Sequence, residues 1–342
     1  MGLGSHEVDR KWSGEHLGFR KHVRAAEFHV SKVAFCFPGQ GSLEPGMGRE
    51  IAEAVPAAME VFERGSEAAG IDLRRLCFEA PLEELLDTEI QQPALVTTSL
   101  AVLAALREHG FEPDYVVGHS VGEFAALAAA SALSMDDAIA LVRERGLAMA
   151  EAARERPGSM AAVLGLDDHV VECLCREIEQ VWPANYNCPG QIVVSGEDPS
   201  VDELCGAAED KGARRTVKLK VSGAFHSPLV AKAADRLRPA IERIRFAEPV
   251  APFMSTVTAK VEPAQRMGGL LVDQLTAPVR FTQAASELVR DGVKTFVEVG
   301  PGNVLSGLVK RIDRSVKAIP VNNLAGIEKL YSVEGASHFP RS

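Results

Sequence analysis

Apolar residues along the chain fall into short buried runs that alternate with stretches of helical spacing. The run at 32–39 (KVAFCFPG) closes with Pro-Gly and predicts a buried strand, and 114–120 (DYVVGHS) predicts a second one. Helical spacing extends over 51–69, 94–108 and 135–153. Because strands and helices alternate in this way, we expect a parallel sheet that helices cover on both faces.

The segment 158–220 has a different rhythm. Its apolar pattern predicts, in order, strand, helix, strand, strand, helix and strand. This βαββαβ order is typical of a ferredoxin-like subdomain. The strand and helix alternation then returns in 221–323. We therefore predict an α/β fold, with a large hydrolase-like parallel-sheet domain made of 32–157 and 221–323 and an inserted ferredoxin-like subdomain at 158–220.

The two ends of the chain have weaker patterns. Residues 1–31 carry four of the nine histidines, mixed charges and little apolar periodicity, which predicts a flexible tail or a remnant of cloning. Acidic residues within this segment argue against a transit peptide. Residues 324–342 are predicted to be a C-terminal tail, part helix and part loose chain.

Composition and charge exclude several classes of protein. Hydrophobic residues make up 46% and charged residues 25% of the 342 residues, as in ordinary globular proteins. The formal charge of −10 argues against a nucleic-acid-binding protein, which needs cationic surface to neutralise phosphates. No apolar stretch reaches the roughly 18–20 residues of a membrane span. We expect no nucleic-acid or membrane partner, and a monomer.

Six cysteines occur without a pattern of metal ligands. Cys173 and Cys175 form one C-x-C pair, and no second pair lies at zinc-ligand spacing. We interpret all six as reduced thiols of a cytoplasmic protein that binds no metal.

The strongest chemical signal is the sequence Gly118-His119-Ser120-Val121-Gly122. It follows a predicted strand and opens a predicted helix, which is the context of a G-x-S-x-G nucleophile turn. The helix N-terminus would place backbone N–H groups beside the Ser120 hydroxyl. The alternative is a serine that only caps the helix.

A serine nucleophile needs a general base, and His226 is the best candidate. It lies where the chain re-enters the large domain, whereas His119 adjoins the serine and should diverge from it. A second glycine-rich turn at 38–42 follows the first strand, so the backbone N–H of Gln40 could pair with that of Val121 as an oxyanion hole. The alternative is an ordinary turn between a strand and a helix.

An inward-facing arginine beyond the serine would bind a substrate carboxylate. Arg143 and Arg145 both lie on the predicted helix 135–153, and the pattern does not choose between them. A guanidinium can hold a carboxylate with two parallel hydrogen bonds, although charges on a helix usually form a solvated face.

These pieces together resemble the malonyl-CoA:acyl-carrier-protein transacylase family and the related acyltransferase domains of polyketide synthases. The resemblance extends from about residue 33 to 323. The motifs that carry it, in order, are FPGQGS (37–42), QQPAL (91–95), GHSVGE (118–123), RERG (143–146), NYNCPGQIVVSG (185–196), SGAFHSPL (222–229), DQLTAPVRF (273–281) and EVGPGNVLSGLVKR (298–311). Eight motifs in this order make the resemblance specific.

The resemblance implies a role for each matching residue. Ser120 would be acylated, His226 would be its base, and the N–H groups of Gln40 and Val121 would hold the oxyanion. Arg145, rather than Arg143, would bind the malonate carboxylate. The residues implied around the substrate are Gln92, His119, Phe225 and Asn187, the last close to the active-site histidine. The backbone carbonyl of Gln274 would orient His226, in place of an acidic third triad member.

The resemblance also implies a ping-pong transfer of malonyl from malonyl-CoA to an acyl carrier protein for fatty-acid synthesis, with coenzyme A as a substrate and no bound cofactor. Val121 and Phe225 match malonyl-selective members, so methylmalonyl should be disfavoured by about 1–3 kcal/mol. Lys310 and Arg311 are the favoured carrier-docking residues. A second basic candidate lies on the subdomain, at Arg214, Arg215, Lys218 and Lys220.

Other functions stay open at this stage. A trans-acting polyketide synthase acyltransferase would share every motif. An acyl hydrolase or thioesterase would share G-x-S-x-G, but α/β-hydrolases place their histidine near the C-terminus, where this chain has only His338 in a polar tail. A non-catalytic scaffold would require the loss of Ser120, His226 or Arg145, and all three are present.

Overall fold

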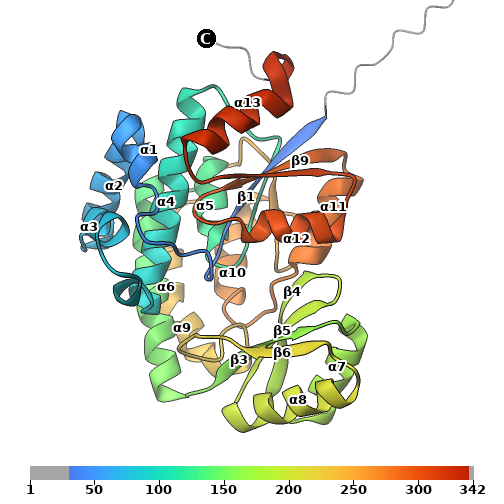
Figure 1. Ribbon diagram of the computed structural model, residues 1–342. Coiled ribbons are helices and arrows are strands. Elements are labelled where there is room, and N and C mark those ends of the chain that lie inside the picture. The colour runs from blue at the N-terminus through green and yellow to red at the C-terminus, as the bar shows by residue number, and fades with distance from the viewer. Residues whose placement is uncertain (1–30, 339–342) are drawn as a thin grey trace, which may run out of the picture. The chain divides into compact units, whose positions relative to one another are not determined.

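A six-stranded sheet forms the centre of the large domain in the computed structural model, which describes residues 31–338 (Figure 1). Its strand order is β10-β9-β1-β2-β7-β8. The first five of these strands run parallel to their neighbours, and β8 pairs antiparallel with β7. The bounds are β1 Lys32–Phe37, β2 Tyr115–Gly118, β7 Phe253–Ser255, β8 Lys260–Val261, β9 Val293–Val299 and β10 Lys317–Val321.

Helices cover both faces of this sheet, as the alternation predicts. Successive residues of β1 point to opposite faces. Phe35 and Phe37 join the core formed with the N-terminal helices, whereas Ala34 and Cys36 join a separate core under α11 and α12. The helices of the large domain are α1 Arg49–Ala54, α2 Pro56–Ala69, α3 Leu73–Phe78, α4 Thr88–Glu108, α5 Gly122–Ala129, α6 Met135–Glu155, α9 Ala231–Glu242, α10 Ala264–Asp273, α11 Phe281–Arg290, α12 Val304–Ile312 and α13 Leu324–His338, with short 3-10 turns at Leu82–Leu85 and Pro228–Val230.

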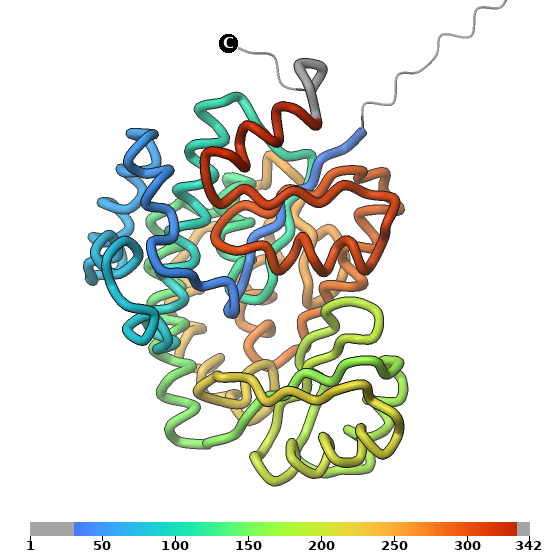
Figure 2. The backbone as a smooth tube through the Cα atoms, viewed as in Figure 1, coloured from blue at the N-terminus to red at the C-terminus, as the bar shows by residue number. Residues whose placement is uncertain are grey.

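The inserted segment folds as the predicted βαββαβ unit. Its elements are β3 Ser159–Leu164, α7 Asp168–Glu177, β4 Val181–Cys188, β5 Gln191–Gly196, α8 Asp198–Asp210 and β6 Arg215–Lys218. They form an antiparallel sheet in the order β4-β5-β3-β6, with its own apolar core. Figure 2 shows this green-to-yellow segment gathered at the bottom of the view, apart from the six-stranded sheet. The fold class predicted from the sequence is confirmed.

Some local predictions are wrong or incomplete. The single helix predicted at 51–69 is two helices, because Val55 adopts an extended conformation (φ −123°, ψ 107°) before Pro56. A residue that precedes proline is disfavoured in the helical region. The edge strand β10 was not predicted, and its Pro320 is tolerated because an edge strand leaves N–H groups unpaired.

The C-terminal segment, predicted to be part helix and part loose chain, is helical over Leu324–His338 and packs against the large domain. Ile327 and Leu330 of α13 are buried, and the Tyr331 hydroxyl donates to the His109 carbonyl oxygen at 2.7 Å. Packing of these residues onto the domain explains why the helix forms. The tail predicted at 1–31 lies almost wholly outside the described residues. Among residues 31–338, no helix has the length and apolar character that crossing a membrane requires.

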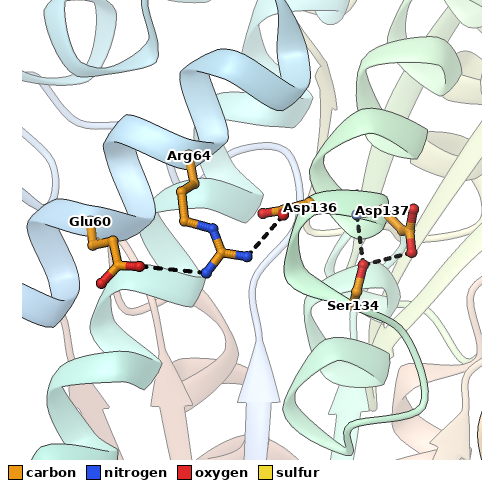
Figure 3. A network of polar contacts seen from close by, with 5 residues as sticks. All are labelled: Glu60, Arg64, Ser134, Asp136 and Asp137. Atoms are coloured by element: carbon orange, nitrogen blue, oxygen red, sulfur yellow. Dashed lines mark hydrogen bonds and ion pairs between the residues drawn. The ribbon is translucent and has the colours of Figure 1, made fainter.

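Helix α6, which carries Arg145, begins at a capped and bridged N-terminus (Figure 3). Ser134 Oγ accepts a hydrogen bond from the Asp137 backbone N–H at 3.0 Å and donates to its carboxylate at 2.6 Å. Arg64 of α2 lies 2.8 Å from Asp136 and 3.6 Å from Glu60. These exposed ion pairs contribute little, so the serine cap is the larger local contribution to helix stability.

Replacement of Ser134 by alanine should therefore lower the free energy of unfolding by about 1 kcal/mol. Urea denaturation of the two proteins measures the difference. Because Ser134 lies about three turns from Arg145, we expect catalytic rates to stay unchanged. A loss of activity without a loss of stability would contradict this assignment.

Candidate active site

Two turns at the carboxyl ends of β1 and β2 build the floor of the site. The two strands end in register, with Phe37 opposite Gly118, so the turns that follow them are neighbours. A Cβ atom at Gly39 would lie 2.5 Å from the His119 carbonyl oxygen, and one at Gly122 would lie 2.1 Å from the Phe37 carbonyl oxygen. Only glycine permits this approach, which explains the glycines of both motifs.

Ser120 occupies the strained position of a nucleophile elbow. Its φ is +52°, in the left-handed region that a residue with a side chain rarely adopts. A Cβ atom at Gly118 would lie 2.1 Å from the Glu123 backbone nitrogen, so the chain turns sharply between strand and helix. The turn holds the Ser120 hydroxyl at the N-terminus of α5, away from the sheet.

His226 is in hydrogen-bond contact with that hydroxyl. Its Nε2 lies 2.8 Å from Ser120 Oγ, and its Nδ1 lies 2.8 Å from the Gln274 carbonyl oxygen and 3.2 Å from that of Ala277. A carbonyl oxygen only accepts, so Nδ1 must carry the proton and Nε2 is the acceptor. This is the tautomer that can take a proton from Ser120.

Burial keeps the His226 imidazole neutral. The pKa of His226 is lowered to about 3, first by burial and then by the positive charge of Arg145. The hydrogen bonds to Gln274 and Ala277 oppose this shift only in part. At neutral pH the ring is therefore a free base, available to accept a proton.

Arg145 is fully buried (0% exposed) beside the same hydroxyl. One terminal guanidinium nitrogen donates to Gln92 Oε1 at 2.6 Å, and the other donates to Ser120 Oγ at 3.1 Å and to Gln274 Oε1 at 3.0 Å. Its Nε has no hydrogen-bond acceptor among the described residues. Arg143, by contrast, donates to the Glu89 carbonyl oxygen at 2.6 Å, away from Ser120.

The Arg145 side chain keeps its charge in this environment. Burial lowers its pKa to about 10, against the stabilising charge of Glu123, so the guanidinium stays protonated at neutral pH. An incoming anion would find a desolvated cation beside Ser120, where a charge acts more strongly than at the surface.

The backbone N–H groups of Gln40 and Val121 are available to stabilise an oxyanion. They belong to the two adjacent turns, and within residues 31–338 neither backbone N–H donates a hydrogen bond to another group. The Gln40 side chain contacts Gln91, which ties the first turn to α4.

His119 and Asn187 form a separate contact. Asn187 Oδ1, on β4 of the subdomain, lies 2.9 Å from His119 Nε2. The hydrogen bond of Asn187 is thus made to the histidine that precedes Ser120, not to His226. Burial lowers the pKa of His119, so its ring is neutral as well and donates to the amide oxygen.

The site opens into a cavity of about 380 Å³ between the large domain and the subdomain. Ser120, His226 and His119 line it together with Phe225, whose ring is buried. The remaining wall residues come from both parts of the chain: Gln40, Gly41, Leu43, Leu82, Leu86, Gln91, Met160, Asn185, Leu219, Lys220 and Val221. The cavity is largely apolar, which suits an acyl chain or a pantetheine arm.

Glu123 is a buried carboxylate that the sequence reasoning did not assign. It is 0% exposed and accepts hydrogen bonds from the Thr256 backbone N–H at 2.6 Å, from Thr256 Oγ1 at 2.8 Å and from Gln274 Nε2. The available signal was a single acidic residue at the start of an otherwise apolar helix, GEFAALAA. A charge in that place needs buried partners.

The predicted docking residues lie in the last turn of α12. Lys310 is exposed, and Arg311 donates to Gln191 Oε1 at 2.7 Å, at the start of β5. On the subdomain, Lys218 is already paired with Asp202 at 2.7 Å. Among the described residues, no group of three or more His, Cys, Asp or Glu side chains is arranged to hold a metal ion.

Comparison with known proteins gives the family. The model of the acyl transferase domain matches residues 34–333. The malonyl CoA-acyl carrier protein transacylase of Bacillus subtilis is 44% identical over 304 residues, which cover 87% of this chain and 96% of that protein. The chain belongs to the malonyl-CoA:acyl carrier protein transacylase family. The Staphylococcus aureus transacylase is 39% identical over 87% of this chain and 98% of its own.

Solved structures of this family share the fold. The acyl-carrier-protein S-malonyltransferase of Bartonella henselae superimposes with a TM-score of 0.86 at 38% identity, over 89% of this chain and 99% of that one. The transacylase of Xanthomonas oryzae gives a TM-score of 0.85 at 41% identity, over 88% and 98%. A malonyl-transacylase in complex with a type II polyketide synthase acyl carrier protein gives 0.85 at 38%, over 89% and 99%.

Proposed function

We propose that this chain transfers the malonyl group of malonyl-CoA to the phosphopantetheine thiol of an acyl carrier protein, for fatty-acid synthesis. The contacts of the Ser120 hydroxyl are the main support for this function. Ser120 and His226 line one cavity, and Ser120 Oγ contacts both this neutral histidine base, at 2.8 Å, and the fully buried Arg145, at 3.1 Å. A nucleophile, its base and a carboxylate-binding cation are what the transfer of a dicarboxylic acyl group requires.

In the first half-reaction, Ser120 Oγ attacks the thioester carbonyl carbon of malonyl-CoA while His226 Nε2 takes the hydroxyl proton. The carbonyl oxygen becomes an oxyanion that the Gln40 and Val121 amides stabilise. The C–S bond then breaks, and His226 returns the proton to the departing coenzyme A sulfur. The product is a malonyl-serine ester and free coenzyme A.

The second half-reaction reverses these roles. The carrier thiol gives its proton to His226, and its sulfur attacks the ester carbonyl carbon. The serine oxygen leaves and recovers the proton from His226. The Gln274 and Ala277 carbonyls hold Nδ1–H throughout, so the imidazolium that forms in each step is oriented and stabilised without an acidic side chain.

We expect the pH profile to reflect this neutral base. Because burial lowers the pKa of His226 to about 3, the base form persists at every higher pH. With acetyl-CoA, a donor that has no carboxylate for Arg145, the acylation rate should stay flat between about pH 5 and pH 8. Quenched-flow acylation over this range is the measurement. An acid limb near the ordinary histidine pKa would contradict the assigned state of His226.

A related acyltransferase of polyketide synthesis is the second candidate. The observation that favours it is the structural similarity to a malonyl-transacylase bound to a type II polyketide synthase carrier protein. The chemistry is the same in both cases and only the carrier differs. A hydrolase is less well supported, because a buried cation beside the serine has no use in releasing a simple acyl group.

The transfer itself is tested with purified carrier protein. Wild-type protein, malonyl-CoA and holo carrier should give malonyl-carrier, observed by intact mass, and apo carrier without its thiol should give none. Fatty-acid and polyketide carriers compared by kcat/KM decide the pathway. Release of free malonate at the rate of malonyl-CoA consumption would instead identify a hydrolase.

Docking of the carrier is proposed at Lys310 and Arg311. Both lie at the end of α12, which contacts the subdomain through β4 and through the Arg311–Gln191 hydrogen bond. The double variant Lys310→Glu, Arg311→Glu should raise the KM for carrier about tenfold and leave Ser120 malonylation unchanged, because a rim charge acts on association.

A matched control is Arg74→Glu on α3, an exposed residue on a helix well separated from α12 in Figure 1. It should leave the carrier KM unchanged. Equal effects of the two charge reversals, or no weakening of wild-type transfer at raised salt, would rule out this docking site.

We also propose a monomer in the cytoplasm. The exposed large apolar residues of the described chain are separated along it, at Leu86, Val250, Val261 and Val304. All six cysteines are free thiols, as a reducing compartment would keep them. Sedimentation at micromolar concentration tests the oligomeric state.

A further inference from the structure

A relay of hydrogen bonds with a fixed direction connects Glu123 to the active-site arginine. The Gln274 side-chain amide donates through Nε2 to the Glu123 carboxylate and, at 3.0 Å, to the Ser120 carbonyl oxygen. Its Oε1 accepts from Arg145 at 3.0 Å. The amide nitrogen must therefore face Glu123 and the amide oxygen must face Arg145.

Glu123 fixes that direction because an ionised carboxylate only accepts hydrogen bonds. Its other oxygen already accepts from the Thr256 backbone N–H and hydroxyl, at 2.6 Å and 2.8 Å. A backbone N–H cannot become an acceptor, so Glu123 cannot offer a donor to that side. Because both carboxylate oxygens of Glu123 must accept hydrogen bonds, only one orientation of the Gln274 amide satisfies every group.

We propose that Glu123 is a positioning residue for malonyl transfer: its carboxylate orients the Gln274 amide, and that amide holds the Arg145 guanidinium beside Ser120. The inference rests on the proposed function, since it assigns Glu123 a part in malonate recognition. Glu123 touches neither the cavity nor the reacting atoms and acts through Gln274. Its negative charge also acts on the buried Arg145 and favours the protonated guanidinium.

The variant Glu123→Gln should disturb the orientation of the Gln274 amide. A glutamine at 123 keeps the shape but must place its NH₂ group at one of the two positions. Toward Thr256 it would meet the backbone N–H donor, so its NH₂ faces the NH₂ group of Gln274. The two donors oppose each other, and relief requires the Gln274 amide to turn over and give up its hydrogen bond to the Ser120 carbonyl oxygen. Gln274 would then present its NH₂ group to Arg145, and the guanidinium would lose an acceptor and be repelled.

The test compares malonyl-CoA with acetyl-CoA as donors for wild type and for Glu123→Gln. We expect kcat/KM for malonyl-CoA to fall about 10- to 100-fold, mainly through KM, because a hydrogen bond to a charged group is lost. Acetyl-CoA has no carboxylate for Arg145, so its kcat/KM should change by less than about threefold. Equal losses with both donors, or no loss, would overturn the proposal.

Glu298→Gln is the matched control. Glu298 is also a buried glutamate (1% exposed), and it accepts from the backbone N–H groups of Leu305 and Ser306 at 2.9 Å and 2.8 Å, outside the cavity. This variant should lose stability but keep the wild-type ratio of malonyl to acetyl transfer. A changed ratio in Glu298→Gln would show that the ratio reports general loosening and would overturn the proposal.

A second variant decides the case if Glu123→Gln does not fold. Gln274→Met keeps the backbone carbonyl that orients His226 and removes the side-chain oxygen that holds Arg145. It should lower kcat/KM for malonyl-CoA more than kcat/KM for acetyl-CoA, and an equal loss with both donors would count against the relay. Wild type assayed in parallel separates the two hypotheses. If wild type does not accept malonyl, the proposed function is wrong. If wild type accepts malonyl and the variants show no malonyl-selective loss, only the role of Glu123 is wrong.

The pH dependence of the malonyl reaction gives an independent readout. Burial raises the pKa of Glu123 to about 7, against the hydrogen bonds from Thr256 and Gln274 and the charge of Arg145. Arg145, from α6, is the charged group that acts on Glu123, and the segments after β7 and α10 present the uncharged Thr256 and Gln274. Protonation adds a donor at 123, so malonyl kcat/KM should fall as pH drops through about 7. The limb should be missing in Glu123→Gln, and its persistence there would contradict the proposal.

Discussion

Replacement of His226 by alanine should lower the rate of Ser120 malonylation by about 10⁴-fold. The imidazole is the acceptor for the serine proton at 2.8 Å, and burial keeps it neutral. Without it, the remaining side chain in hydrogen-bond contact with Ser120 Oγ, among the described residues, is the cationic Arg145, which cannot accept a proton. Single-turnover acylation by malonyl-CoA, followed by intact mass, measures the rate.

Imidazole added to the His226→Ala variant supplies a control. The alanine leaves space next to a cavity of about 380 Å³, so free imidazole should restore part of the rate if a base is all that is missing. Thermal unfolding close to that of wild type shows that the fold is kept. Acylation within about tenfold of wild type would mean that another group is the base.

Replacement of Arg145 by alanine should reverse the preference for a dicarboxylic donor. Loss of one partner of a buried, hydrogen-bonded charge pair costs about 2–5 kcal/mol. At about 1.4 kcal/mol per factor of ten, kcat/KM for malonyl-CoA should fall roughly 30- to 4,000-fold. Acetyl-CoA, which makes no ion pair, should lose far less and become the better donor. Competition between the two donors, read by the mass of the adduct, measures the preference.

Two further variants sharpen the Arg145 result. Arg143→Ala on the same helix should keep the wild-type preference, because Arg143 donates to the Glu89 carbonyl oxygen and not to the site. Arg145→Lys should not restore it, since one ammonium group cannot reach Gln92, Gln274 and a carboxylate with the geometry of a guanidinium fork. An equal loss with both donors in Arg145→Ala would contradict the carboxylate role.

The fold could be predicted because its signals are local. Apolar runs and turn residues mark β1, β2 and the βαββαβ insertion, and each follows from the spacing of neighbouring residues. The break between α1 and α2 was also readable in principle, since Pro56 follows Val55. The edge strand β10 gave little signal because five residues that include a proline do not read as a strand.

The candidate site was predictable only where a motif fixes the backbone. The glycines around Ser120 predict the nucleophile elbow, because neighbouring backbone atoms leave no room for a Cβ atom at these positions. The choice between Arg143 and Arg145 needed a family resemblance, since helical spacing does not say which face is buried beside the serine. Glu123 was missed because its partners, Thr256 and Gln274, are more than 130 residues away along the chain.

The most direct test of the central claim is the intact mass of the protein after brief incubation with malonyl-CoA, with acetyl-CoA, methylmalonyl-CoA and a Ser120→Ala variant in parallel. We expect one malonyl adduct on the wild type, weak adducts from the other two donors and none on Ser120→Ala. No adduct on the wild type, or an equal malonyl adduct on Ser120→Ala, would contradict it.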